Sequence, residues 1–139
     1  MEDIDSVIFC STCEEAKVDG CQLHPPVFSK FSDFELVVTR SHIQGAGEGV
    51  INHGPEIPEG VLFGPYTGKF YTADVHKKMP DSGNAWRIFN PGNGRTAGFI
   101  DPGVVEDANK HWMAKINCTA KTARQNLAGF QYRGQIFYR

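Results

Sequence analysis

Glycine and proline interrupt this chain so often that a domain of long helices is excluded. Its 139 residues include 15 glycines and 8 prolines, spread along the whole length. They cut the apolar segments into pieces too short for helices, because both residues are disfavoured inside a helix. The β-branched and aromatic content of these pieces predicts the short strands of a small, mainly β fold. We expect strands at 35–39, 49–52, 61–65, 85–90, 98–101, 126–132 and 135–138.

Local signals also predict the connections between these strands. Arg133-Gly134 is a two-residue link between the last two predicted strands, and its second residue is glycine. This arrangement is typical of a tight β-hairpin. Helix is expected only at 72–79 and 107–114, as one or two turns each.

Composition places the chain among ordinary globular proteins. Hydrophobic residues make up 40% and charged residues 22%, which is enough for a packed core. The 14 Lys and Arg residues against 16 Asp and Glu give a net charge of −2, without the basic excess of a dedicated nucleic-acid binder. The N-terminus lacks a targeting pattern, and no apolar run approaches membrane-spanning length. We expect a soluble, intracellular protein with no membrane partner, whose cysteines are thiols or metal ligands.

A cluster of cysteines and histidine near the N-terminus has the spacing of a metal site. The pattern C-x2-C-x7-C-x2-H is formed by Cys10, Cys13, Cys21 and His24. Three thiolates and one imidazole complete a tetrahedral set for Zn²⁺ and leave no place for a substrate, so the predicted zinc is structural. The alternative is unligated side chains. Since the composition changes around Pro25-Pro26, we expect a zinc knuckle at 1–30 and a second domain at 31–139.

Two further features are ambiguous when they are taken alone. The glycine-rich run from Gly45 to Gly49 matches neither the dinucleotide fingerprint nor the phosphate-binding loop. It indicates either a sharp turn into a strand or a loop that approaches a ligand. Cys118 is either a small buried side chain or, with His111 as its partner, a nucleophile.

Four blocks of sequence, taken in order, carry a family resemblance. They are IPEGVLFGPYTG at 57–68, NKHWMAKINC at 109–118, QNLAGFQ at 125–131 and QIFYR at 135–139. From about residue 36 to Arg139 the chain resembles the PR/SET domain of the PRDM family of protein-lysine methyltransferases. The preceding Cys/His segment resembles the zinc knuckle of the family's meiotic member, a histone H3 methyltransferase that marks recombination sites.

The resemblance implies a SET-domain (β-clip) fold of small curved sheets. In this fold S-adenosylmethionine and a lysine enter from opposite faces and meet in a narrow channel. The resemblance places Tyr66 and Tyr138 at this channel as catalytic residues. It also implies a set of cofactor contacts: Ala46, Gly47, Glu48, Asn84, Asn117 and Cys118. The segment expected to bind the histone tail as an added strand comprises Asp81, Ser82, Gly83, Asn84, Ala85, Trp86 and Arg87.

The residues themselves leave alternatives open, and the family pattern is not fully kept. Without the resemblance, Tyr66, Tyr138 and Trp86 are equally explained as core aromatics. Asn84 stands where the family's meiotic member has a tyrosine that touches the cofactor, and Asn117-Cys118 stands where ordinary SET enzymes have an asparagine-histidine pair. We also expect the chain to stop before the family's final aromatic-Tyr-Gly segment, which supplies a further catalytic tyrosine.

The functional expectation is a nuclear histone-lysine N-methyltransferase that acts in chromatin or transcription regulation. Its cofactors would be S-adenosylmethionine and a structural zinc ion, and its partners the histone H3 tail and other chromatin proteins. The alternative is a catalytically silent PR-domain interaction module in a transcriptional regulator. DNA contacts are expected only through regions outside this chain. A zinc protein that binds nucleic acid directly would need a basic face around Lys110, Lys115, Lys121 and Arg124.

Overall fold

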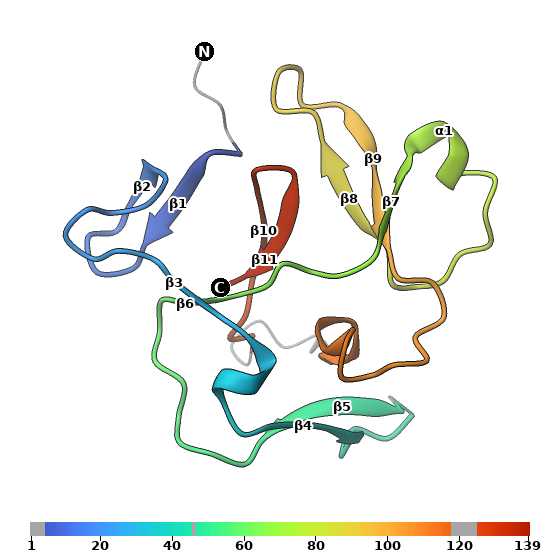
Figure 1. Ribbon diagram of the computed structural model, residues 1–139, viewed down its shortest axis with the longest axis horizontal. Helices are drawn as coiled ribbons and strands as arrows, with labels where there is room; N and C mark the ends of the chain where they lie inside the picture. The colour runs from blue at the N-terminus through green and yellow to red at the C-terminus, as the bar shows by residue number, and fades with distance from the viewer. Residues whose placement is uncertain (1–4, 46, 118–124) are drawn as a thin grey trace.

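The computed structural model describes residues 5–45, 47–117 and 125–139, and these residues form a mainly β fold of short strands (Figure 1). The mainly β prediction is therefore confirmed. In chain order the strands are β1 (Val7–Cys10), β2 (Glu15–Val18), β3 (Val27–Ser29), β4 (Leu36–Arg40), β5 (Glu48–Asn52), β6 (Val61–Phe63), β7 (Lys69–Thr72), β8 (Trp86–Phe89), β9 (Thr96–Asp101), β10 (Gly129–Tyr132) and β11 (Gln135–Tyr138).

The strands pair into small separate sheets. Two of these are antiparallel pairs, β1 with β2 and β4 with β5. A three-stranded sheet has the order β7-β9-β8, and a four-stranded sheet has the order β10-β11-β6-β3. The predicted strands are found within a few residues of their expected positions, whereas β1, β2, β3 and β7 were not predicted. Most residues of β2 are exposed, so this strand carries no apolar signal and is held by its backbone pairing with β1.

The helical predictions are correct only in part. The prediction at 72–79 corresponds to α1 (Ala73–His76), which begins where the Thr72 hydroxyl accepts a hydrogen bond from the Val75 amide. The prediction at 107–114 is correct only at its end. Residues 108–111 form a turn that leads into the 3₁₀-helix η2 (Trp112–Lys115), of which only Met113 is buried. A second 3₁₀-helix is η1 (Phe31–Asp33). No helix of the described ranges is long and apolar enough to cross a membrane.

The hairpin prediction is confirmed. Strands β10 and β11 are antiparallel, and Arg133 and Gly134 connect them with φ angles of 49° and 73°. Two positive φ angles define the type of turn whose twist matches that of the paired strands. In Figure 1 this hairpin (red) lies in the middle of the molecule, between the β1–β2 pair and the β8–β9 strands.

The four-stranded sheet joins distant parts of the chain. Strand β3 runs parallel to β6, with Val27 opposite Val61, and Tyr138 of β11 lies opposite Phe63 of β6. Since β3 lies within 1–30, the N-terminal segment contributes a strand to the sheet of the following domain. The division of the chain at residue 30 stays a prediction.

The main core lies between the four-stranded and the three-stranded sheets. Its buried side chains come from β6, β8, β9, η2, β11 and the segment after β6, and they are Phe63, Tyr66, Ile88, Ile100, Met113, Ile136 and Tyr138. Trp86 and Trp112 pack against this cluster from its edge. Both predicted catalytic tyrosines are therefore core residues as well.

The packing of Trp86 on β10 makes Gly129 sensitive to substitution. A Cβ atom at residue 129 would lie 2.5 Å from the Trp86 ring. We expect Gly129→Ala to lower the free energy of unfolding by about 1–3 kcal/mol, because the ring must shift within a packed core. Urea unfolding measures the change. At Gly92 the nearest atom to a new Cβ is the Asn90 side-chain oxygen at 3.2 Å, so Gly92→Ala is the control. Equal stability of the two variants would contradict this account.

Candidate functional site

Three aromatic side chains form the centre of the candidate site. Tyr66 follows β6, Trp86 begins β8 and Tyr138 ends β11. The ring centroids of Tyr66 and Tyr138 are 6.3 Å apart, and the Trp86 ring lies 6.2 Å from Tyr66 and 5.7 Å from Tyr138. Tyr66 and Tyr138 are only 4% and 9% exposed. The fold thus brings together the two predicted catalytic tyrosines and one residue of the predicted substrate segment.

Hydrogen bonds fix both phenol groups. The Tyr66 hydroxyl donates to the Asn84 carbonyl oxygen at 2.6 Å. The Tyr138 hydroxyl accepts a hydrogen bond from Trp86 Nε1 at 3.1 Å and donates to the Met113 carbonyl oxygen at 3.4 Å. Burial raises the pKa of Tyr66 above its ordinary value, and the nearby Tyr138 and Asp101 add to the shift. The Tyr66 phenol is therefore neutral at physiological pH, and its oxygen keeps lone pairs that can accept weak CH hydrogen bonds.

A second group of predicted residues meets where β5 lies beside η2. Asn117 donates from its side-chain nitrogen to the Glu48 carbonyl oxygen at 3.0 Å and accepts at Oδ1 from the Ser41 hydroxyl at 2.6 Å. A Cβ at Gly49 would lie 2.5 Å from Asn117 Oδ1, so this strand position needs glycine. The Gly47 carbonyl accepts a hydrogen bond from the Ser41 amide at 2.7 Å.

The described part of the glycine-rich run begins in a turn at Gly45 and ends in strand β5. Gly45 and Gly47 have φ angles of 79° and 70°, which only glycine adopts without strain. Strand β5 begins at Glu48, and Lys115 Nζ lies 3.2 Å from the Glu48 carboxylate. Three of the six predicted cofactor contacts, Gly47, Glu48 and Asn117, are therefore close together. Ala46 and Cys118 lie outside the described residues.

Asn84 belongs to the aromatic group. Its side-chain nitrogen donates to the Gly103 carbonyl oxygen at 3.1 Å, while its own carbonyl accepts from Tyr66. The short helix η2 connects the two groups, because Met113 contacts Tyr138 and Asn117 follows η2 by two residues. The candidate site thus extends from the glycine turn, along η2, to the aromatic centre.

The predicted substrate segment is a loop followed by an edge strand. Asp81 accepts a hydrogen bond from the Gly83 amide at 2.8 Å, and the loop continues through Ala85 into β8. The Arg87 side chain donates to Thr96 Oγ1 at 2.6 Å, so it is held against β9. In the order β7-β9-β8, strand β8 is the last strand, and an outer strand can accept another chain by backbone pairing.

Asp101 organises the loop before β8 and was not predicted. Its carboxylate accepts hydrogen bonds from the Ser82 hydroxyl at 2.6 Å, the His76 Nε2 at 2.8 Å and the Gly103 amide at 2.8 Å. The Ser82 oxygen in turn accepts from the Asn84 amide at 3.1 Å. Burial opposes ionisation of Asp101, but the bonds from Ser82, His76 and Gly103 outweigh it and hold its pKa below the ordinary 3.8.

These hydrogen bonds predict an acid-sensitive contribution to stability. Because the pKa of Asp101 is lowered on folding, its contribution is complete above the unfolded value near 3.8 and is lost as pH falls through the folded value. We expect unfolding free energy to decrease less steeply between about pH 5 and pH 2 in Asp101→Asn than in the native chain. Asp74→Asn changes an exposed carboxylate that forms an ion pair with Lys77, and it serves as the control. Identical pH profiles for all three proteins would contradict the assignment.

A hollow lies beside Tyr66. The polar residues that line it were not predicted as site residues from the sequence. Its volume is about 710 Å³, and the residues that line it include Tyr66, Thr67, Asp101, Gly103 and His111. Thr67 Oγ1 lies 2.6 Å from His111 Nδ1. His111, considered above as a partner of Cys118, is thus hydrogen-bonded to Thr67. The available sequence signal was weak, since a threonine after Tyr66 and a histidine before Trp112 are common surface residues.

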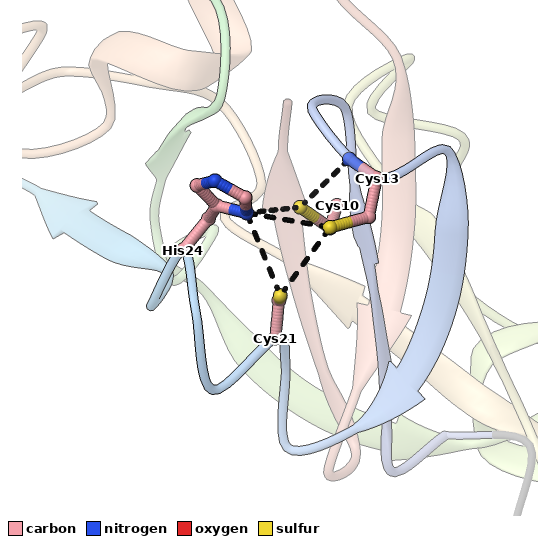
Figure 2. Close-up of side chains that lie close together, drawn as sticks. All are labelled: Cys10, Cys13, Cys21 and His24. Carbon is pink, nitrogen blue, oxygen red and sulfur yellow. Dashed lines mark hydrogen bonds between the residues drawn. The ribbon is translucent and has the colours of Figure 1, made fainter.

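The metal-site prediction corresponds to a compact cluster at the other end of the molecule. Figure 2 shows the side chains of Cys10, Cys13, Cys21 and His24 pointing toward one another. The Cys13 and Cys21 sulfurs are 3.8 Å apart, and His24 Nδ1 lies 3.3 Å from the Cys13 sulfur and 3.7 Å from each of the others. All four ligand atoms lie within 4.8 Å of one another.

These separations fit a tetrahedral zinc site. Zn–S bonds of about 2.3 Å and Zn–N bonds of about 2.0 Å place the ligand atoms about 3.5–3.8 Å apart. The backbone amide of His24 lowers the pKa of Cys21 to about 6 against the opposing effect of burial, whereas the hydrogen bond with Cys21 raises the pKa of Cys13 to about 11. A divalent cation among these sulfurs would favour all three thiolates. The cluster is compatible with zinc in number, type and geometry of ligands.

Comparison with solved structures identifies the fold. The methyltransferase domain of human PR domain-containing protein 2 matches with a TM-score of 0.56 and 18% sequence identity, over 86% of this chain and 82% of that one. The small sheets around the aromatic core are therefore those of a SET-like PR domain.

Sequence comparison then identifies the family. The family model for the PR domain of PR domain zinc finger protein 2 matches residues 36–139, and this chain belongs to the PR domain family. The predicted resemblance is confirmed. Human histone-lysine N-methyltransferase PRDM7 is 34% identical over 97% of this chain and 29% of its own length. The histone-lysine N-methyltransferase set-17 of Caenorhabditis elegans is 32% identical over 99% of this chain and 52% of its own length. The chain thus spans about a third to a half of these relatives.

Proposed function

We propose that this chain is a histone-lysine N-methyltransferase domain of the PRDM type. Family membership and the names of its relatives support a protein-lysine methyltransferase. The observation that carries the proposal is the group formed by the buried Tyr66 and Tyr138 and the half-buried Trp86, beside the edge strand β8. Bound S-adenosylmethionine would supply an activated methyl group. The neutral lysine amine would form a bond to this methyl carbon as the carbon–sulfur bond breaks. S-adenosylhomocysteine would leave, and the methylated ammonium would release its proton to solvent.

Each part of the site has a proposed role. Tyr66 and Tyr138 would line the channel, where neutral phenol oxygens accept CH hydrogen bonds and aromatic faces favour a cationic methyl donor. The cofactor would be bound by six residues: Ala46, Gly47, Glu48, Asn84, Asn117 and Cys118. Residues 81–87 would pair with the histone H3 tail.

The N-terminal cluster would hold a structural zinc ion. All four ligand positions are filled by protein side chains, so the ion would stabilise the segment at 1–30 and take no part in methyl transfer. We also propose that the protein acts on chromatin in the nucleus. A direct nucleic-acid interface has less support: Lys115 is paired with Glu48, and Lys121 and Arg124 lie outside the described residues.

Titration calorimetry with S-adenosylmethionine tests the cofactor site. The native chain should bind with an affinity that Asn117→Ala weakens about tenfold or more, since Asn117 links the glycine turn to η2. Asn93→Ala, in the exposed turn between β8 and β9, should bind as the native chain does. Native chain that is folded and loaded with zinc but gives no binding heat would contradict the enzyme proposal and favour a silent interaction module.

A further inference from the structure

A buried glutamine holds the end of strand β8. Gln131 lies on β10 and is 8% exposed. Its side-chain oxygen accepts a hydrogen bond from the Phe89 amide at 2.9 Å, and its side-chain nitrogen donates to the Phe89 carbonyl oxygen at 3.0 Å. The side chain therefore satisfies both backbone groups of one residue, as a neighbouring strand would.

These bonds lie on the outer edge of β8. The amide of Asn90 donates to the Arg95 carbonyl, so Asn90 faces β9. Successive residues of a strand present their backbone groups to opposite sides. The register shift between Ile88 and Phe89 places the additional residue in β9, so the alternation along β8 is kept and Phe89 and Arg87 face away from β9. Gln131 thus occupies one end of the edge on which a peptide strand would add, and leaves Arg87 as the next outward-facing residue.

The same side chain connects β8 to the N-terminal segment. Gln131 Nε2 also donates to Asp5 Oδ2 at 3.1 Å, and Asp5 is 6% exposed. This carboxylate oxygen accepts from the Gly134 amide at 2.8 Å, while the Asp5 carbonyl accepts from the Arg133 amide at 2.7 Å. Asp5 therefore fixes both the hairpin turn and the side chain that reaches β8.

The opposite end of β8 is tied to the same hairpin. Trp86 donates to the hydroxyl of Tyr138, and its ring packs over Gly129. Strand β8 is thus attached to the hairpin at its first residue by Trp86 and at its last residue by Gln131. A strand held at both ends presents its outer edge in one position to an incoming peptide.

We propose that Gln131 is a positioning residue for the peptide substrate: it fixes the outer edge of β8 relative to Tyr138 and sets where an added strand must end. This inference rests on the proposed function for its substrate. Gln131 would touch neither the cofactor nor the reacting atoms. Asp5 would hold the Gln131 side chain in place and so affect β8 only indirectly.

The test uses the full chain with zinc and two variants. Gln131→Met keeps the side-chain length but removes all three hydrogen bonds, and Gln131→Glu keeps only an acceptor for the Phe89 amide. Both should raise the KM for an H3 tail peptide about tenfold, with kcat and the KM for S-adenosylmethionine changed less than about twofold. Amide hydrogen exchange at Phe89 should become faster in both.

A matched control separates this role from general docking of the N-terminal segment. Asp19→Asn weakens another link between that segment and the hairpin, to Arg133 and Tyr132, without touching β8. It should change neither the peptide KM nor Phe89 exchange. The inference would be overturned if amide exchange at Phe89 were unchanged in both Gln131 variants. It would also be overturned if the KM for the peptide and the KM for S-adenosylmethionine changed equally. If the native chain transfers no methyl group, the proposed function fails, and Phe89 exchange still decides whether Gln131 fixes β8.

Discussion

Replacing Tyr138 by phenylalanine is expected to lower kcat for methyl transfer about a hundredfold. The hydroxyl is the acceptor for Trp86 Nε1, so its loss leaves this N–H without that bond and removes an oxygen from the proposed channel. The aromatic ring remains, so the affinity for S-adenosylmethionine should change less than about threefold. Single-turnover rates with an H3 peptide measure the first effect and calorimetry the second.

Tyr132→Phe is the control for this substitution. Tyr132 lies on the same hairpin, but its hydroxyl donates to Asp19 on the side of the N-terminal segment. Removing this exposed bond should leave kcat unchanged. A Tyr138→Phe variant that turns over at the native rate would show that Tyr138 is only a core residue.

Loss of a zinc ligand is expected to abolish the structure of the N-terminal segment. Cys21 is a buried member of the cluster, and Cys21→Ala leaves three ligands and an incomplete site. Zinc contributes about 10–16 kcal/mol of binding free energy to small modules of this kind, which have little core of their own. Metal analysis should find less than half an equivalent of bound zinc in this variant. Hydrogen exchange should show rapid exchange of the amides in β1 and β2.

Leu23→Ala tests whether this effect is specific to the ligands. Leu23 lies between Cys21 and His24 but is 79% exposed. This variant should bind a full equivalent of zinc and keep the protection of β1 and β2. Native protein that contains no zinc after purification and refolding with the metal would contradict the proposed site.

Features that depend on neighbouring residues could be predicted from the sequence. The turn at Arg133-Gly134 follows from a two-residue link whose second residue is glycine, and the metal cluster follows from two close ligand pairs. Strand β3 could not be predicted, since its residues are held by pairing with Val61–Phe63 far along the chain. The expected helix at 107–114 is found only as the 3₁₀-helix that begins at Trp112, because the apolar residues of this segment that pack against the core lie at its end.

The aromatic centre was assigned through the family pattern, and the structure adds what positions it. Asp101 and Gln131 are polar residues that look like surface positions in the sequence. They are buried because other parts of the fold supply their hydrogen-bond partners. Asp101 is bonded to His76 and Ser82. Gln131 is bonded to Phe89 and Asp5. Such partners are set by long-range topology and leave no local pattern.

Mass spectrometry of an H3 tail peptide, incubated with the zinc-loaded chain and S-adenosylmethionine, tests the central claim most directly. The claim is that the site around Tyr66, Trp86 and Tyr138 transfers a methyl group to a lysine. The predicted result is a peptide whose mass increases by one or more methyl groups on a lysine side chain, with less product from Tyr138→Phe. An unmodified peptide from folded native chain that binds the cofactor would contradict it.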